Sequence, residues 1–178
     1  MNEPARGNLV LIGYRGSGKT TVGREAARRL GYALVDTDER IVAQAGMAIA
    51  EIFDVEKEAG FRKREARVVR AVMAGDRQVI SMGGGAILQA DNVACMRERG
   101  FVVWLKAPAE VLWERIEADS GTAANRPALT SLGGLDEIRS VLGARAAKYK
   151  RAAHTCVDAS MAVGAVVDAV IAAYAPGR

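Results

Sequence analysis

The sequence contains little cysteine, histidine or aromatic residue, and each shortage argues against a class of site. Its two cysteines, Cys95 and Cys156, form neither a CxxC pair nor a metal-ligand spacing, so we expect them to be core thiols. The single histidine, His154, stands before an apolar segment, which favours a structural role over His-dependent catalysis. Aromatic residues make up 5% of the chain, and with no long Lys/Arg run this scarcity argues against a nucleic-acid partner.

Long apolar runs are also missing. No stretch approaches the roughly 20 apolar residues of a membrane span, and residues 1–8 show no signal-peptide pattern. We therefore expect no membrane partner and a cytoplasmic location. The formal net charge of +4 is spread along 178 residues, and a site for anionic small molecules accounts for this surplus. The length fits one domain, residues 1–178, which we expect to be a monomer.

Apolar runs alternate with helical periodicity along the chain, which is typical of βαβ units on a parallel sheet. The pattern predicts a three-layer α/β fold, with a five-stranded parallel sheet flanked by helices. The expected strands are residues 9–12, 32–35, 78–82, 101–105 and 155–158. The expected helices are residues 19–30, 39–45, 55–73, 91–99, 109–118, 135–151 and 162–173, with a helical turn at 49–53. Residues 119–134 predict a long loop, which in a compact domain is usually functional or mobile.

Residues 13–20 (GYRGSGKT) match the phosphate-binding pattern G-x-x-x-x-G-K-[ST] between an expected strand and an expected helix. The glycines let backbone N–H groups converge on an anion at the positive end of that helix. Lys19 would contact the β- and γ-phosphates, and the Thr20 hydroxyl would bind the Mg²⁺ that bridges them. The expected nucleotide contacts in the loop are Gly16, Ser17, Gly18, Lys19, Thr20 and Thr21. The pattern alone does not separate a kinase from a GTPase switch or a motor protein.

Asp36 and Asp38 follow the second expected strand at the carboxyl edge of the sheet, where ligands bind in open α/β folds. A carboxylate there can orient an acceptor hydroxyl or the hydration shell of Mg²⁺. The alternative is that both aspartates cap the next helix. Arg62 and Arg115, taken without their neighbours, are also compatible with solvated charges on helix surfaces.

Five short elements, in this order, resemble shikimate kinase, and the resemblance extends from about Asn8 to Val170. They are the P-loop, Asp36-Thr37-Asp38, Phe61-Arg62-Lys63-Arg64-Glu65, Gly83-Gly84-Gly85 and Asn125-Arg126-Pro127. Residues 46–53 also match a G-x-x-I-x-E-I-F segment of the family. The resemblance implies a P-loop kinase fold. It further implies in-line transfer of the γ-phosphoryl group of ATP to the 3-hydroxyl of shikimate, with Mg²⁺ as cofactor.

The resemblance also implies roles for the matching residues. Lys19, Asp38 and Arg126 would be catalytic, with Asp38 orienting or deprotonating the attacking hydroxyl and Arg126 in a lid at about 119–134. Asp36 would support Mg²⁺ through water, and Arg115 and Arg126 would contact ATP. The implied shikimate contacts are Asp38, Phe53, Phe61, Arg62, Glu65, Gly83, Gly84, Gly85 and Arg145. Of these, Arg62 and Arg145 would bind the carboxylate, and a substrate-binding segment is expected at about 38–65.

The sequence departs from the family at two places. Ala128 stands where the family usually has leucine in the lid, and residues 158–160 lack the basic residue that often lies near adenine. Three alternative functions are a gluconate kinase, a nucleoside monophosphate kinase and a non-catalytic relative that binds shikimate or nucleotide. The aspartate pair, F-R-x-x-E and the triple glycine argue against the first two. The retained catalytic set argues against the third.

Overall fold

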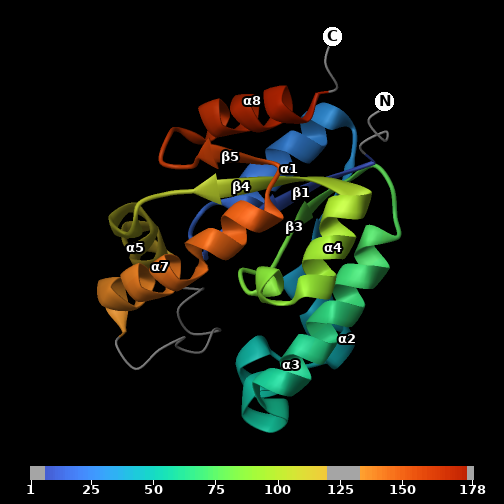
Figure 1. Cartoon of the computed structure of the whole chain (residues 1–178), viewed down its shortest axis with the longest axis vertical. Coiled ribbons are helices and arrows are strands. Elements are labelled where there is room, and N and C mark those ends of the chain that lie inside the picture. Colours follow the sequence, from blue (N-terminus) through green and yellow to red (C-terminus); the bar gives the residue numbers. More distant parts are fainter. Residues whose placement is uncertain (1–6, 120–132, 176–178) are drawn as a thin grey trace.

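The computed structural model describes residues 7–119 and 133–175. All five strands form one parallel sheet in the order β2-β3-β1-β4-β5 (Figure 1). The strands are β1 (Asn8–Ile12), β2 (Ala33–Asp36), β3 (Gln78–Ser81), β4 (Gly100–Lys106) and β5 (Thr155–Asp158). Because the strands are parallel, all their carboxyl ends meet at one edge of the sheet, so the loops that follow them form a common surface.

Helices pack on both faces of the sheet, which gives the three layers that the sequence predicts (Figure 1). The helical elements are α1 (Lys19–Leu30), α2 (Thr37–Ala45), α3 (Ile49–Met73), the 3₁₀ helix η1 (Ala86–Leu88), α4 (Ala90–Arg99), α5 (Ala109–Ala118), α7 (Gly134–Ala152) and α8 (Val163–Tyr174). Successive side chains of β1 point to opposite faces: Leu9 and Leu11 pack with α1 and α8, whereas Val10 and Ile12 pack with α3 and α4. Burial on both faces explains why β1 is an unbroken apolar run.

The predicted strands and helices are present, and α1 and α5 have the predicted ends. Residues 49–73 form two helical segments joined at a kink, as the predicted turn at 49–53 and separate helix at 55–73 suggest, and the kink lies at Lys57, which has non-helical backbone angles (φ 60°, ψ −178°). The sequence pointed instead to Gly60 as the weak position. Helix α4 begins at Ala90, one residue before its predicted start, and the side chain of the preceding Gln89 makes no capping hydrogen bond. The single-domain organisation stays a prediction, and the lid expected at about 119–134 lies almost wholly outside the described residues.

The prediction that both cysteines are core thiols is wrong for Cys156. This residue is exposed because β5 is an edge strand, where Val157 faces the core and its neighbours do not. Cys95 is partly buried beside the core. His154 has a structural contact, since its Nδ1 accepts a hydrogen bond from the backbone N–H of Val102 at 2.9 Å.

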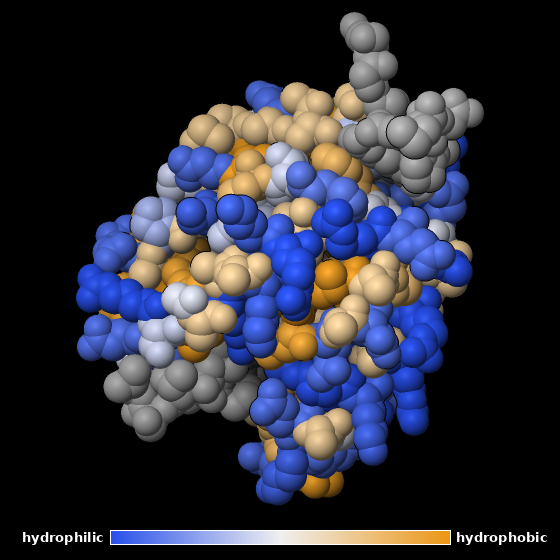
Figure 2. Space-filling model, viewed as in Figure 1, coloured by the Kyte–Doolittle hydropathy of each residue, from blue (hydrophilic) through white to orange (hydrophobic). Residues whose placement is uncertain are grey.

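The face shown in Figure 2 is largely hydrophilic with scattered apolar patches. Within residues 7–119 and 133–175, no helix is both long and apolar enough to cross a membrane. Four large apolar side chains of the described residues are exposed: Val42, Val55, Met161 and Val163. Met161 and Val163 line a pocket beside the P-loop.

Candidate active site

The P-loop runs from the end of β1 into α1 and is held by its own lysine. Lys19 Nζ donates hydrogen bonds to the carbonyl oxygens of Gly13 and Tyr14, at 2.9 and 3.1 Å. Gly18 precedes α1 with φ 88° and no side-chain cap, so the first N–H groups of the helix face the loop interior without a side chain to satisfy them. A Cβ on Gly13 would lie 2.7 Å from the carbonyl oxygen of Leu105. A loop of this conformation can accept a phosphate group at the start of α1, and the phosphate cradle itself stays a prediction.

Three side-chain oxygens from three elements meet beside this cradle. Thr20 Oγ1 donates to Asp36 Oδ2 at 2.8 Å and lies 3.3 Å from Ser81 Oγ. The other carboxylate oxygen of Asp36 accepts from the N–H groups of Asp38 (3.0 Å) and Glu39 (3.4 Å), so it caps α2. Asp36 therefore caps α2 and still has an oxygen in a position compatible with a hydrated Mg²⁺. Hydroxyl and carboxylate oxygens are ligands that suit Mg²⁺ or its bound waters, so the residues present fit that ion.

A pocket next to the P-loop, here called the P-loop pocket, extends from the cradle to the segment after β5. It is lined by the expected residues Gly16, Ser17, Gly18, Lys19, Thr20, Thr21, Asp36 and Arg115, and also by Asp38, Ser81, Met161 and Val163. Arg115 links the two ends of this pocket, because it donates to the carbonyl oxygens of Gly16 (3.4 Å) and Ala159 (2.8 Å).

The segment after β5 has an apolar character in this pocket. Ser160 donates hydrogen bonds to Asp158 through its N–H and its hydroxyl, and the described residues after the strand, 159–175, include no basic side chain. Met161 and Val163, which are 39% and 45% exposed, supply an apolar wall instead. The absence of a basic residue at 158–160 does not by itself predict this apolar wall.

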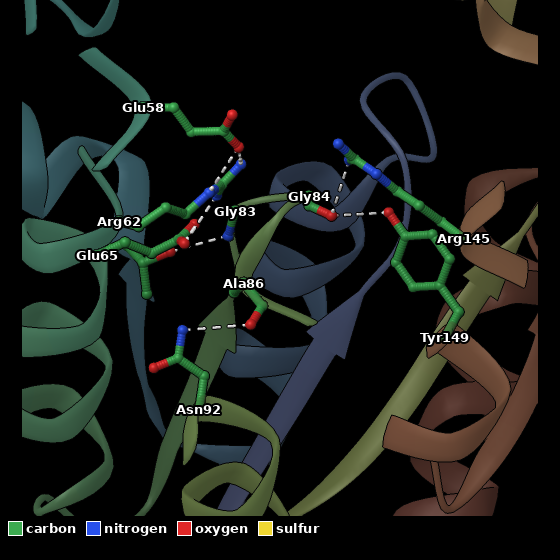
Figure 3. Close-up of polar contacts among 10 residues, drawn as sticks. Glu58, Arg62, Glu65, Gly83, Gly84, Ala86, Asn92, Arg145 and Tyr149 are labelled. Carbon is green, nitrogen blue, oxygen red and sulfur yellow. Dashed lines mark hydrogen bonds and ion pairs between the residues drawn. The ribbon is translucent and has the colours of Figure 1, made fainter. Parts of the chain in front are cut away.

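A second pocket, the arginine pocket, lies at the same sheet edge. Its lining includes every residue expected there: Asp38, Phe53, Phe61, Arg62, Glu65, Gly83, Gly84, Gly85 and Arg145. The rings of Phe53 and Phe61 form one side, with their centroids 4.6 Å apart. Arg62 comes from α3 and Arg145 from α7, and they lie on either side of the glycine segment (Figure 3). The two cations thus belong to one pocket although 83 positions separate them (145 − 62).

Buried charge surrounds the arginine pocket. Arg62 Nη1 donates to Glu65 Oε2 at 2.8 Å, and the Glu65 side chain is only 2% exposed. Burial raises the pKa of Glu65 above its ordinary value, and the neighbouring Arg62 opposes that rise. Arg145 Nη1 donates to the carbonyl oxygen of Gly84 at 3.5 Å. An anionic ligand would therefore meet the guanidinium groups of Arg62 and Arg145, and that of Arg62 is already anchored by a carboxylate.

The backbone of the glycine segment lies very close to charged side chains of the pocket. A Cβ on Gly83 would stand 2.6 Å from Asp38 Oδ1, and one on Gly85 would stand 2.4 Å from Arg62 Nη1. Neither position leaves room for alanine without displacing a charged group that lines the pocket. Bare backbone here lets Asp38 and Arg62 approach the pocket floor.

Three further residues line the pockets without having been predicted to do so: Tyr14, Arg15 and Ser81. Arg15 lines both pockets, and its Nη2 donates to Glu137 Oε1 of α7 at 2.8 Å. The P-loop pattern leaves positions 14 and 15 open, so it assigns them no role. Ser81 ends β3 directly before the glycines, and its polarity at the end of an apolar strand was the available signal. Arg126 and Ala128 lie outside the described residues.

A P-loop on a parallel five-stranded sheet, with a second cation-lined pocket at the same edge, defines a P-loop kinase that acts on a small molecule. The family model described as shikimate kinase matches residues 15–175. The chain belongs to the shikimate kinase family.

Individual relatives agree with this membership. The chain is 46% identical to a shikimate kinase of Symbiobacterium thermophilum over 85% of this chain and 87% of the relative. It is 44% identical to shikimate kinase 2 of Dickeya chrysanthemi, over 94% and 93% of the two chains. Among solved structures, shikimate kinase from Acinetobacter baumannii in complex with shikimate matches with a TM-score of 0.83 and 35% identity, covering 94% of this chain and 90% of the other.

A gluconokinase from Sinorhizobium meliloti matches with a TM-score of 0.60 at 18% identity, over 96% of this chain and 92% of the other. At that identity the likeness shows a shared fold and no shared substrate. The gluconate alternative therefore receives no support from it.

Proposed function

We propose that this chain transfers the γ-phosphoryl group of ATP to the 3-hydroxyl of shikimate, giving shikimate 3-phosphate and ADP. The observation that carries the proposal is that Asp38 lines both the P-loop pocket and the arginine pocket. A carboxylate shared by the two pockets can orient an acceptor hydroxyl toward the phosphates and accept its proton.

The donor side of the reaction belongs to the P-loop. Backbone N–H groups of residues 16–21 would hold the phosphates, with Lys19 as the mobile cation. Thr20 would hold Mg²⁺ directly and Asp36 would do so through water, and the ion when bound neutralises charge on the β- and γ-phosphates. Arg115 would lie against adenine, opposite the apolar wall of Met161 and Val163. The contacts between Arg115 and the two loop carbonyls support this placement.

The acceptor side would use the arginine pocket. Arg62 and Arg145 would bind the carboxylate of shikimate, because two planar guanidinium groups suit a planar anion. Glu65 would keep Arg62 in place, and the supporting contact is their 2.8 Å ion pair. Phe53 and Phe61 would cover the ring, and Gly83, Gly84 and Gly85 would form the floor beneath it. The segment at about 38–65 would then be the substrate-binding segment.

Charge that develops during transfer needs a further cation. We assign that role to Arg126, in a lid at about residues 119–134, on the strength of the resemblance. A single domain acting as a cytoplasmic monomer completes the proposal.

A panel of acceptors tests the function. Shikimate, quinate, gluconate and nucleoside monophosphates are each supplied with Mg²⁺ and ATP, and ADP release and the phosphorylated product are both measured. We expect turnover with shikimate and a large preference over the other acceptors. Binding of shikimate without turnover would point to a non-catalytic relative, and preference for another acceptor would overturn the substrate.

Asp38→Asn tests the shared carboxylate. Asparagine keeps the size of the side chain but cannot take the proton, so we expect most turnover to be lost with little change in unfolding temperature. Asp91→Asn, an exposed change in α4 that lines neither pocket, is the control. Near-normal turnover of Asp38→Asn would remove Asp38 from its role.

A further inference from the structure

Thr37, which stands between the two aspartates, has no exposed surface although it begins α2. Its hydroxyl donates to the carbonyl oxygen of Ser81 at 3.3 Å and accepts from the N–H of Gly83 at 2.9 Å. The ladder between β2 and β3 ends at the pair Asp36 and Ser81. The Thr37 side chain thus continues the connection between the two strands by one step, where backbone pairing has stopped.

The group that Thr37 holds lies against Asp38. A Cβ on Gly83 would be 2.6 Å from Asp38 Oδ1, so the Gly83 backbone forms one wall of the space around that carboxylate. Any movement of Gly83 changes the gap in which an acceptor hydroxyl would have to sit. Thr37 and Asp38 are adjacent in α2, and the same two hydrogen bonds therefore set the distance between Asp38 and the glycine segment.

A second hydroxyl holds the next residue from the opposite side. Tyr149 of α7 donates to the carbonyl oxygen of Gly84 at 2.9 Å (Figure 3). Its ring has no exposed surface and stacks on Trp104 of β4, with the centroids 5.4 Å apart and the planes 12° from parallel. Burial raises the pKa of Tyr149 to about 12, so the hydroxyl stays a hydrogen-bond donor at neutral pH.

We propose that Thr37 and Tyr149 are positioning residues for phosphoryl transfer, which hold the glycine floor at a fixed distance from Asp38 by hydrogen bonds from two sides. The proposal rests on the proposed function. Neither residue lines the P-loop pocket or the arginine pocket, so each acts through the Gly83 and Gly84 backbone. A misplacement of roughly 1 Å at a reacting centre can cost about 100-fold in rate.

Conservative variants test this role. Thr37→Val keeps the shape and removes both hydrogen bonds, and Tyr149→Phe removes only the hydroxyl. We expect Thr37→Val to weaken shikimate binding and to lower kcat/KM for shikimate by about 10- to 100-fold, and Tyr149→Phe by a smaller factor of about 3 to 10. The Kd for ATP should stay within about twofold, because neither residue lines the P-loop pocket. Thr37→Ser returns the hydroxyl and should recover most of the lost activity.

A merely structural role predicts a different result. Tyr174→Phe is the matched control, since its buried ring also gives up a hydroxyl contact, to Tyr32 at 3.3 Å, and it lines neither pocket. We expect that variant to change stability alone. If Thr37→Val lowers only the unfolding temperature and keeps wild-type kcat and KM for shikimate, the inference fails. If Thr37→Val does not fold, Tyr149→Phe decides by the same criteria.

Shikimate binding by calorimetry separates this inference from the proposed function. A wild-type protein that binds shikimate without turnover overturns the function, and the variants still test positioning through their Kd for shikimate. A wild-type protein that neither binds nor phosphorylates shikimate overturns both.

Discussion

Thr20 and Asp36 share one hydrogen bond of 2.8 Å, and the carboxylate that accepts it has a separate task on each oxygen. Oδ2 faces the Thr20 hydroxyl, whereas Oδ1 accepts from two N–H groups at the start of α2. Helix capping and the proposed support of Mg²⁺ are therefore compatible at this residue, because each would use a different carboxylate oxygen. Different substitutions separate the two roles.

Asp36→Asn should keep the cap and weaken Mg²⁺ use. Asparagine can still accept from the helix N–H groups, but it lacks the negative charge that a Mg²⁺ hydration shell favours. We expect the Mg²⁺ concentration for half-maximal activity to rise several-fold with little loss of stability. Asp36→Ala should show the same shift and also lose about 1 kcal/mol of unfolding free energy. Equal stability of the two variants, measured by urea unfolding, would contradict the assignment of the cap.

Lys57→Gly should stabilise the protein. Lys57 has φ 60° and ψ −178°, a region that is almost restricted to glycine. Relief of this strain should raise the unfolding free energy by about 1 kcal/mol, even though the 2.6 Å contact from Lys57 Nζ to the Asp54 carbonyl oxygen is lost. Lys63→Gly, at an exposed helical position of α3, should instead lower it by about 1 kcal/mol. Loss of stability in both variants would show that Lys57 is not strained.

Arg15 and Glu137 join the P-loop to α7 through a 2.8 Å ion pair in which the glutamate side chain is 2% exposed. Removal of one partner from a buried pair leaves the other charge uncompensated, so Glu137→Ala should cost about 3 kcal/mol or more. Glu110→Ala breaks the Arg139–Glu110 pair, whose side chains are 54% and 55% exposed, and should cost much less unfolding free energy because water screens both charges. Urea unfolding of both variants makes the comparison. Similar losses of unfolding free energy in the two variants would show that the burial of Glu137 does not make its ion pair more important for stability.

Glu65 should make stability depend on pH in an unusual direction. Its pKa in the folded protein is raised by burial, so folding favours the protonated form. The stabilising contribution is complete below the unfolded pKa and is lost as pH rises toward the folded pKa. We therefore expect the unfolding free energy of the wild type, relative to Glu65→Gln, to fall as pH rises above the ordinary pKa of a glutamate side chain.

Chemical unfolding at several pH values measures this difference. Glu58→Gln is the control, because Glu58 is 67% exposed and also faces Arg62. A difference between wild type and Glu65→Gln that grows with pH would show that Arg62 outweighs burial.

Much of the active-site region follows from short stretches of sequence. The P-loop is a local structure, since one glycine pattern between a strand and a helix is enough to specify it. The arginine pocket could be predicted only as a set of residues, by resemblance, because Arg62 and Arg145 come from different helices. No sequence pattern predicts the contacts of Tyr14, Arg15 and Thr37. They lie within recognised motifs, at positions that the motifs leave unassigned.

The order of strands and helices, the P-loop and the family can all be predicted from the amino-acid sequence, because these depend on periodicity and on motifs within a few residues. Which distant groups meet depends on the packing of the whole chain. The strand order β2-β3-β1 brings Thr37 to Gly83, 46 positions away, and the packing of α7 brings Glu137 to Arg15, 122 positions away. The exposure of Cys156 likewise depends on β5 being an edge strand. Such pairings follow from how the whole chain packs, and no local pattern encodes them.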